Sequence, residues 1–301
     1  IESRRECLQP LIELFQNYKG FSMATQNPVI TIIADNSASS PLEAEHGFSC
    51  LIEFEGMKPL LFDTGRGVLF HNAAELGKNL TDVSTLVLSH GHYDHTDALT
   101  DFFTLNTTAK LICSEHIFTE HYSMKTGKLR TIGLSEENAQ TIKNLPDEQK
   151  VFVKKSTSIP SYGITVYESI PQTNDLEKPS ALLYCNKECT KSDTMIDEAV
   201  ISIETDKGLV LITGCCHCGF MNMCSHVIEE TKGKHIHSVI GGFHLAGVSK
   251  ERMDATVNFI REHKIDAVYP CHCTGEREMQ MMETALPSIV QKAYCGFSIS
   301  F

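Results

Sequence analysis

Short apolar segments with the pattern of buried strands recur in two parts of the chain, and they constrain its fold more than any other feature. One series lies between residues 29 and 114, and the second lies between residues 199 and 286. Each series starts with consecutive strands and then alternates between strand and helix patterns. We therefore expect an α/β (α+β) fold in which helices pack outside a central pair of sheets. The expected strands are 29–36, 48–54, 59–65, 85–90, 110–114, 199–205, 208–214, 237–242 and 266–271, and the expected helices are 66–78, 95–105, 219–231, 249–263 and 275–286.

The segment 120–198 between the two series is irregular, with scattered Gly, Pro, Ser, Asn and charged residues. It contains a few short strand patterns, such as VFVKK and GITVYES. Long irregular segments in compact domains are usually lids, binding loops or disordered regions. We predict a single domain, 28–301, in which 120–198 is an insertion or lid over the functional site. Residues 1–27 are expected to be an N-terminal extension. Either it contains a short amphipathic helix, or the natural start is at Met23 and the residues before it are leader sequence.

The composition is that of a globular protein with an acidic surface. Hydrophobic residues make up 42% and charged residues 21% of the 301 residues. No apolar run approaches the roughly 18 residues of a membrane-spanning helix, so no membrane partner is expected. The net charge of −12 disfavours binding to nucleic acid. We expect a small-molecule anionic substrate, because bound metal ions can supply local positive charge, and the sequence leaves a homo-oligomer open.

Twelve cysteines are a high count for this chain, and several of them lie in tight groups. The chain is long and its start lacks the pattern of a secretion signal, so we expect free thiols and a cytoplasmic protein. The groups lack the paired CxxC spacing of iron–sulfur or structural zinc sites, which argues against such a site. They are Cys185 and Cys189; Cys215, Cys216, Cys218 and Cys224; and Cys271 and Cys273.

The segment SHGHYDH, which ends at His95, carries the clearest chemical signal. It directly follows an expected apolar strand and precedes an expected helix. Imidazole and carboxylate ligands suit zinc, iron or manganese. The spacing allows His90 and His92 to face one ion while Asp94 and His95 face a second. The alternative is a polar loop in which Asp94 only caps the next helix.

Three further histidines lie just after expected strands. They are His217, His244 and His272, and the carboxyl ends of strands are where sites gather in open α/β sheets. Taken singly, each could be an ordinary loop histidine, but their shared placement favours a common site. The histidines in helical or turn contexts are expected at the surface. These are His71, His121, His235, His237 and His263.

Together these motifs resemble the metallo-β-lactamase superfamily over about residues 28–290. SHGHYDH resembles the HxHxDH signature, FDTG resembles a strand motif of the family, and VYPCHCTG resembles its last histidine motif. The resemblance implies a four-layer αββα sandwich and two divalent metal ions, zinc most readily. It also implies that Asp63 supports the histidine loop from behind and that His272 is a metal ligand. AEHGFS, GLVLITGCCHCG and IGGFHL narrow the resemblance to a branch described as similar to a 7,8-dihydropterin-6-methyl-4-(β-D-ribofuranosyl)-aminobenzene-5'-phosphate synthase.

One departure from the family pattern concerns the bridging Asp, which would fall at or near Cys215. Either the Cys215 thiolate bridges the metals, or His217 replaces the carboxylate, or the two metals are held unequally. We favour His217 as the ligand and a supporting role for Cys215. His46 is a further candidate for contact with the substrate.

The resulting hypothesis is a metal-dependent hydrolase that attacks a phosphate ester, phosphodiester or acyl ester with an activated water molecule. Asp94 and His244 are the candidate catalytic residues. One alternative is a transferase that joins a pterin to an aryl ribosyl phosphate, as the branch resemblance implies. The other alternative is a non-catalytic iron or redox-sensing metal protein.

Overall fold

The computed structural model of the chain describes residues 27–301. The N-terminal helix and the start at Met23 that the sequence suggested lie outside these residues. Two large sheets face each other, and the first holds seven strands in the order β16-β1-β2-β3-β4-β5-β8. These strands are β1 (Val29–Ala34), β2 (Ser49–Glu53), β3 (Leu60–Phe62), β4 (Thr85–Val87), β5 (Lys110–Ser114), β8 (Lys150–Val153) and β16 (Ser298–Ser300).

The second sheet holds six strands in the order β15-β14-β13-β12-β10-β9. Its strands are β9 (Ser156–Ile159), β10 (Ile164–Glu168), β12 (Ala199–Thr205), β13 (Gly208–Thr213), β14 (Ile236–Gly242) and β15 (Ala267–Cys271). In both sheets the central strands are parallel, namely β3, β4 and β5 in the first sheet and β13, β14 and β15 in the second. Their carboxyl ends therefore meet at one edge of each sheet, where the loops with the candidate ligands begin.

Alternation of buried side chains along the strands explains why each sheet is covered on both faces. Phe62 and Ile212 belong to the core between the sheets, whereas Leu61 and Leu211 belong to the cores beneath the helices. Strands that are buried on both sides are read as continuous apolar runs, as the sequence indicated.

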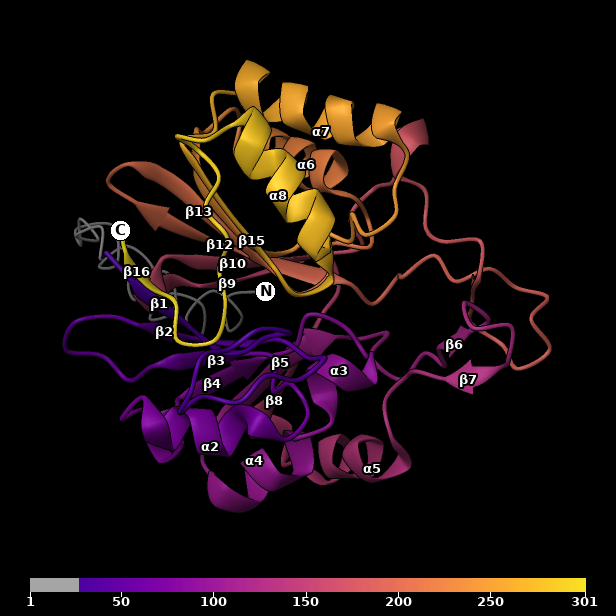
Figure 1. Cartoon of the computed structure of the whole chain (residues 1–301). Coiled ribbons are helices and arrows are strands. Elements are labelled where there is room, and N and C mark those ends of the chain that lie inside the picture. The colour runs from indigo at the N-terminus through magenta and orange to yellow at the C-terminus, as the bar shows by residue number, and fades with distance from the viewer. Residues whose placement is uncertain (1–26) are drawn as a thin grey trace, which may run out of the picture.

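Helices cover the outer face of each sheet (Figure 1). The order of layers is therefore helix, sheet, sheet, helix, which confirms the αββα sandwich expected from the sequence. The expected helix 95–105 is divided into two, because Asp97 and Ala98 form a turn in which Ala98 departs from helical dihedral angles. The helices on the first sheet are α2 (Val68–Glu75), α4 (Leu99–Leu105) and α5 (Glu136–Asn144), and the short α3 (Tyr93–Thr96) lies directly before α4 in the chain. The helices on the second sheet are α6 (Phe220–Glu230), α7 (Lys250–Glu262) and α8 (Glu276–Ala285).

The segment 120–198 does not form one insertion, contrary to the sequence prediction. Its strand β8 extends the first sheet, β9 and β10 extend the second, and α5 packs on the first sheet. A separate three-stranded sheet, β11-β6-β7, projects from the sandwich (Figure 1). Its strands are β6 (Tyr122–Ser123), β7 (Arg130–Thr131) and β11 (Leu183–Tyr184). We call the projecting sheet with its connecting loops the projecting unit.

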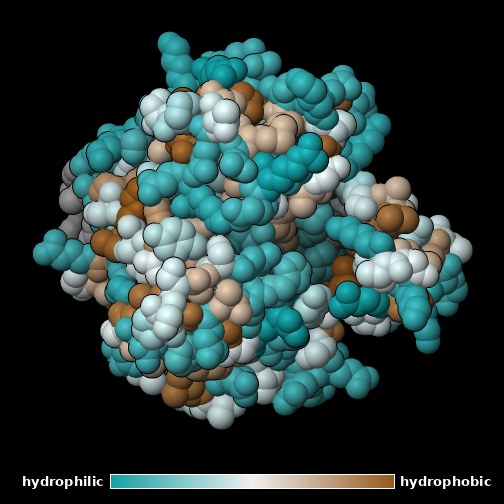
Figure 2. Space-filling model, in the orientation of Figure 1, coloured by the Kyte–Doolittle hydropathy of each residue, from teal (hydrophilic) through white to brown (hydrophobic). Residues whose placement is uncertain are grey.

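Edge strands account for this error. The strand patterns VFVKK and GITVYES correspond to β8 and β10, but a local pattern does not show which sheet a strand joins. β9 lies at a sheet edge and alternates between exposed and half-buried residues, so it lacks the apolar pattern of the central strands. β16 was missed for the same reason, since Ser298 and Ser300 are exposed where the strand pairs with β1. Figure 2 shows a mostly hydrophilic face on the main body, with the projecting unit standing away from it. Within residues 27–301 no helix has the length and apolar character needed to cross a membrane.

Candidate metal centre

The loop that follows β4 brings His90 and His92 next to His217, which follows β13. One ring nitrogen of each lies within 4.8 Å of the others, and all three residues are buried. The Nε2 atoms of these histidines are buried and have no hydrogen-bond partner among the described residues. Buried polar atoms are nearly always paired, so three unpaired nitrogens that converge on one point fit a metal ion. We call these residues the first ligand set.

The fully buried Asp63 fixes the orientation of this loop. Its carboxylate accepts hydrogen bonds from the Ser89 amide and hydroxyl, both at 2.6 Å, and lies 2.7 Å from Nδ1 of His95. Nδ1 of His90 lies 2.8 Å from the Ser89 hydroxyl oxygen, which can accept a hydrogen bond from a protonated Nδ1. With Nδ1 protonated, Nε2 of His90 and His95 keeps its lone pair for a metal. Gly214 makes room for this network, since a Cβ there would lie 2.2 Å from the Ser89 oxygen.

A second ligand set consists of Asp94, His95, Cys215 and His272, whose ligand atoms also lie within 4.8 Å of one another. Nε2 of His95 is 3.1 Å from the Cys215 sulfur, and Nε2 of His272 is 3.5 Å from the Asp94 carboxylate. Burial would raise the pKa of Asp94, but His95 and His272 outweigh it and hold the pKa well below its usual value. Asp94 is therefore a carboxylate, as a metal ligand must be.

The sequence analysis favoured His217 as the ligand in place of the bridging Asp and a supporting role for Cys215, and the two ligand sets differ from this assignment. His217 joins the first set, and the Cys215 sulfur lies among the ligand atoms of the second set instead of behind them. Burial and the neighbouring Cys273 raise the pKa of the Cys215 thiol well above its usual value. As a thiolate bound to a metal, it would supply the negative charge that the missing Asp would carry. Zinc accepts such mixed nitrogen, oxygen and sulfur ligands.

Several residues that the sequence analysis did not single out support the ligands from behind. Asp35 accepts a hydrogen bond from the His272 amide at 2.7 Å, and Asn36 accepts from Nδ1 of the same residue at 2.9 Å. Glu198 accepts from the His217 and Cys218 amides at 2.5 and 2.7 Å. Burial raises the pKa of Glu198 to about 7. Asp35 and Asn36 follow a buried strand, so the rule that polar residues after strands build sites could have found them.

His121 is fully buried, so its predicted surface position is wrong. Its Nδ1 lies 2.5 Å from the Asp193 carboxylate and its Nε2 lies 3.2 Å from that of Asp197. The same Asp197 oxygen accepts the amide of Gly91 at 2.7 Å, and the His121 ring packs edge-on against that of His92. The acidic partners lie more than seventy positions away, so no local pattern could reveal this burial. Of the other histidines expected at the surface, His71, His235 and His263 are exposed and His237 is partly exposed.

A cavity of about 430 Å³ opens above the two ligand sets. In its wall, Nε2 of His244 lies 3.3 Å from the Lys125 ammonium, and the His244 ring packs 4.3 Å from that of His217. His46 places Nε2 3.2 Å from the Asp94 carboxylate. Other side chains that line the cavity are Asn36, Tyr93, Ser123, Thr126, Arg130, Ile132, Leu183 and Cys273. The projecting unit thus supplies one wall, and its cations face the candidate ligands.

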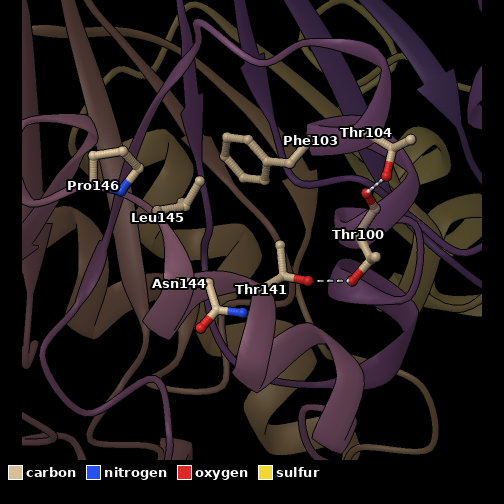
Figure 3. Close-up of a pocket in the computed structure, with 7 residues that line it drawn as sticks. All are labelled: Thr100, Phe103, Thr104, Thr141, Asn144, Leu145 and Pro146. Carbon is tan, nitrogen blue, oxygen red and sulfur yellow. Dashed lines mark hydrogen bonds between the residues drawn. The ribbon is translucent and has the colours of Figure 1, made fainter.

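A smaller pocket of about 240 Å³ lies between α4 and α5 (Figure 3). Thr100 and Thr141 bond to each other across it at 2.8 Å, while Phe103 and Leu145 form its apolar side. It offers no titratable side chain and shares no residue with the cavity over the ligand sets. The larger cavity is therefore the candidate active site.

Fold and site together define a protein of the αββα class with a buried place for two neighbouring metal ions. The family model of the metallo-beta-lactamase superfamily matches residues 43–165. An uncharacterised protein of Methanocaldococcus jannaschii is 30% identical over 255 residues, which cover 82% of this chain and 91% of the relative. The chain belongs to the metallo-β-lactamase superfamily, as its sequence motifs predicted. Proteins of this fold generally bind divalent metals.

Two further comparisons give more detail. The 7,8-dihydropterin-6-methyl-4-(beta-D-ribofuranosyl)-aminobenzene-5'-phosphate synthase of the same organism is 26% identical over 272 residues, 87% of this chain and 92% of the relative. Tm1679 is described as a metal-dependent hydrolase of the beta-lactamase superfamily, and its sequence is 27% identical to that of this chain. Its crystal structure matches with a TM-score of 0.76, and the match covers 90% of this chain and 98% of Tm1679. The fold of YhfI from Bacillus subtilis is also similar, with a TM-score of 0.57 at 12% identity over 92% of this chain and 100% of YhfI.

Proposed function

We propose that this protein is a metal-dependent hydrolase of a small anionic molecule, either a phosphate ester, a phosphodiester or an acyl ester. One observation carries the proposal. Two adjoining sets of buried ligand atoms form the floor of a cavity, and the same cavity is lined by Lys125 and Arg130. Ligand sets without an open cavity would suit a structural metal, and a cationic cavity without ligands would suit simple anion binding.

The residues would divide the work as follows. His90, His92 and His217 would hold one metal ion, and the second ligand set would hold the other. When bound, a pair of divalent ions supplies Lewis acidity and an activated water molecule, and zinc suits this set best, although iron or manganese also accept imidazole and carboxylate. Lys125 and Arg130 would bind the anionic group of the substrate, and His46 lies where it can contact the substrate beside Asp94.

His244 has the geometry of a proton donor. An ammonium group has only donors, so Nε2 of His244 accepts from Lys125 and the ring proton of a neutral imidazole lies on Nδ1. Nδ1 is buried and has no hydrogen-bond partner among the described residues. It can therefore donate to a substrate oxygen or a leaving group. Asp94, as a carboxylate beside His46 and His272, can accept a proton in the same cavity.

A substrate screen with a ligand variant tests this proposal. The metal-loaded protein would be assayed with a phosphomonoester, a phosphodiester, a lactone and a thioester, in parallel with His92→Ala. We expect turnover of one class by the wild type, and loss of both activity and metal in His92→Ala, because a ligand of the first set is removed. Absence of turnover in every class with two metals bound would contradict hydrolysis. Two metals retained in His92→Ala would contradict the ligand assignment.

A synthase is the second candidate, and the relative named as a dihydropterin compound synthase supports it. That name describes a product with a 5'-phosphate, and a cavity with Lys125 and Arg130 offers groups that suit a phosphate. Incubation of the metal-loaded protein with a dihydropterin donor and an aryl ribosyl phosphate would separate the candidates. A condensed product detected by mass spectrometry would favour the synthase over the hydrolase.

A further inference from the structure

Far from the candidate active site, two histidines and an aspartate converge at the surface. His235 directly precedes β14, His237 lies within it, and Asp266 directly precedes β15. Nε2 of His235 lies 2.7 Å and Nδ1 of His237 lies 2.8 Å from the same Asp266 oxygen. All three ligand atoms lie within 4.8 Å of one another.

We propose that His235, His237 and Asp266 form a further transition-metal site, separate from the two ligand sets of the cavity. Two imidazoles and one carboxylate are a donor set for Zn²⁺, Co²⁺, Ni²⁺ or Cu²⁺, whereas Mg²⁺ and Ca²⁺ prefer oxygen ligands alone. The remaining coordination positions face solvent, since the side chains of His235 and Asp266 are 41% and 51% exposed. Zn²⁺ is the ion we assign.

The backbone holds this donor set in place before any ion binds. The Asp266 amide donates to the His237 carbonyl at 3.2 Å, and the Leu209 amide donates to the His235 carbonyl at 2.8 Å. The residues therefore belong to neighbouring parallel strands of one sheet, and binding has little backbone to order. Ligands about 2.0–2.2 Å from zinc in a tetrahedron lie roughly 3.4 Å apart, so each nitrogen-to-oxygen distance must lengthen by less than about 1 Å.

A metal ion can replace the hydrogen bonds of this cluster without a further group to take up protons. In the hydrogen-bonded cluster, the nitrogens that face Asp266 act as donors to its oxygen. When an ion takes their place, each neutral ring keeps its single proton, which moves to the nitrogen that faces away. The carboxylate remains ionised, and the net charge of −12 favours the approach of a cation.

The place of this cluster separates it from the catalytic cavity. It lies at the amino ends of β14 and β15, whereas His244 and His272 follow their carboxyl ends. The seven residues of β14 span about 20 Å between the two ends. An ion at the cluster would link the amino ends of two core strands. Phe301 lies close to the cluster, with its ring centroid 6.0 Å from that of His237.

Metal titration of the holoprotein tests the assignment. Protein with its cavity sites filled and excess metal removed would be titrated with Zn²⁺ in a calorimeter. We expect one further equivalent to bind in the wild type. Loss of a residue that hydrogen-bonds to a metal ligand typically lowers metal affinity about 10–100-fold. Loss of a ligand itself should cost at least as much, so His235→Gln should weaken Zn²⁺ binding at least tenfold. The matched control is His263→Gln, which also removes an exposed histidine and should leave the further equivalent unchanged.

A spectroscopic readout keeps the test independent of stability and of any substrate. Cu²⁺ added to the same protein should give an electron paramagnetic resonance spectrum with coupling to two nitrogens in the wild type and to one in His235→Gln. Absence of a further Zn²⁺ equivalent in the wild type would overturn the proposal. Identical Zn²⁺ affinity or identical Cu²⁺ spectra in the wild type and His235→Gln would overturn it as well, and would leave a cluster held by hydrogen bonds alone.

Discussion

At the scale of single residues, Asp63 organises much of the candidate site. One buried carboxylate accepts three hydrogen bonds, and through Ser89 and His95 it orients a ligand of each set. Asp63 itself has φ of 58°, a conformation that costs energy for a residue with a side chain. His244 and His272 share this feature, with φ of 46° and 48°. Three residues of the candidate site thus have a backbone conformation that is costly for residues with side chains.

Replacement of His244 separates a role with substrate from a role with metal. We expect His244→Ala to keep the full metal content and to lower kcat/KM by about 10²–10⁴-fold, the usual contribution of a proton-transfer group. Metal analysis and steady-state kinetics on an identified substrate provide the measurement. Loss of one metal would make His244 a ligand, which its nearness to the Cys215 and Cys273 sulfurs would then explain.

Replacement of His121 tests a buried ion pair and has a defined pH dependence. Burial alone would lower the pKa of His121, but Asp197 and Asp193 outweigh it and raise the pKa to about 10. The charged ring therefore contributes stability in full below the unfolded pKa of about 6.5, and this contribution is lost as the pH rises through about 10. We expect His121→Gln to cost about 3–5 kcal/mol near pH 6.5, because it leaves two buried carboxylates without their cation.

Thermal unfolding between pH 6.5 and pH 10 measures this effect. The difference in Tm between wild type and His121→Gln should narrow as the pH rises. His71→Gln removes an exposed histidine and serves as the control, with no such trend. A Tm difference that stays constant up to pH 10 would show that His121 is neutral in the folded protein.

At the scale of elements, the projecting unit connects the cavity wall to the loop that carries the candidate ligands. Its β6–β7 turn carries Lys125 into the cavity wall, and the residue before β6, His121, is joined through Asp197 to the Gly91 amide. Within 120–198, the projecting unit lines one wall of the cavity, whereas β8, β9, β10 and α5 belong to the sandwich, and a cover over the site stays a prediction.

Lys125→Met tests the role of the projecting unit in binding. The variant removes the cation from the cavity wall and keeps most of the side-chain length, so we expect KM for an anionic substrate to rise about tenfold with metal content unchanged. Lys128→Met is the matched control, since Lys128 is exposed in the same turn and does not line the cavity. Equal KM values for the two variants would contradict a role of Lys125 in anion binding.

At the scale of the whole molecule, the candidate ligands come from both halves of the sandwich. His90, His92, Asp94 and His95 follow β4 of the first sheet, whereas Cys215, His217 and His272 follow strands of the second. Each ligand set therefore joins the two sheets. Bound metals would hold the halves together, and their binding free energy would add to the free energy of unfolding.

Metal removal should therefore destabilise the whole fold. Each metal present at about 1,000 times its dissociation constant contributes roughly 4 kcal/mol. Two metals therefore contribute roughly 8 kcal/mol, which corresponds to a decrease in Tm on the order of 10 °C after chelation. Calorimetric scans with and without a chelator measure this shift, and re-addition of zinc should reverse it. His92→Ala should show a smaller chelator effect. An unchanged Tm would mean that the sites do not bridge the two halves.

The sequence by itself determined the central strands, the helices on both faces and most of the candidate ligands. Continuous apolar runs predicted the buried strands, and local spacing after those strands identified His90, His92, Asp94, His95, His217 and His272. These patterns can be recognised in the sequence because the burial of a strand and the position of its end depend on a few neighbouring residues. Only the tertiary structure decided the rest. The edge strands β9 and β16 lack an apolar pattern, and the pattern VFVKK of β8 does not show which sheet that strand joins. The burial of His121 depends on carboxylates more than seventy positions away, and the place of Cys215 among the ligands depends on how one sheet faces the other.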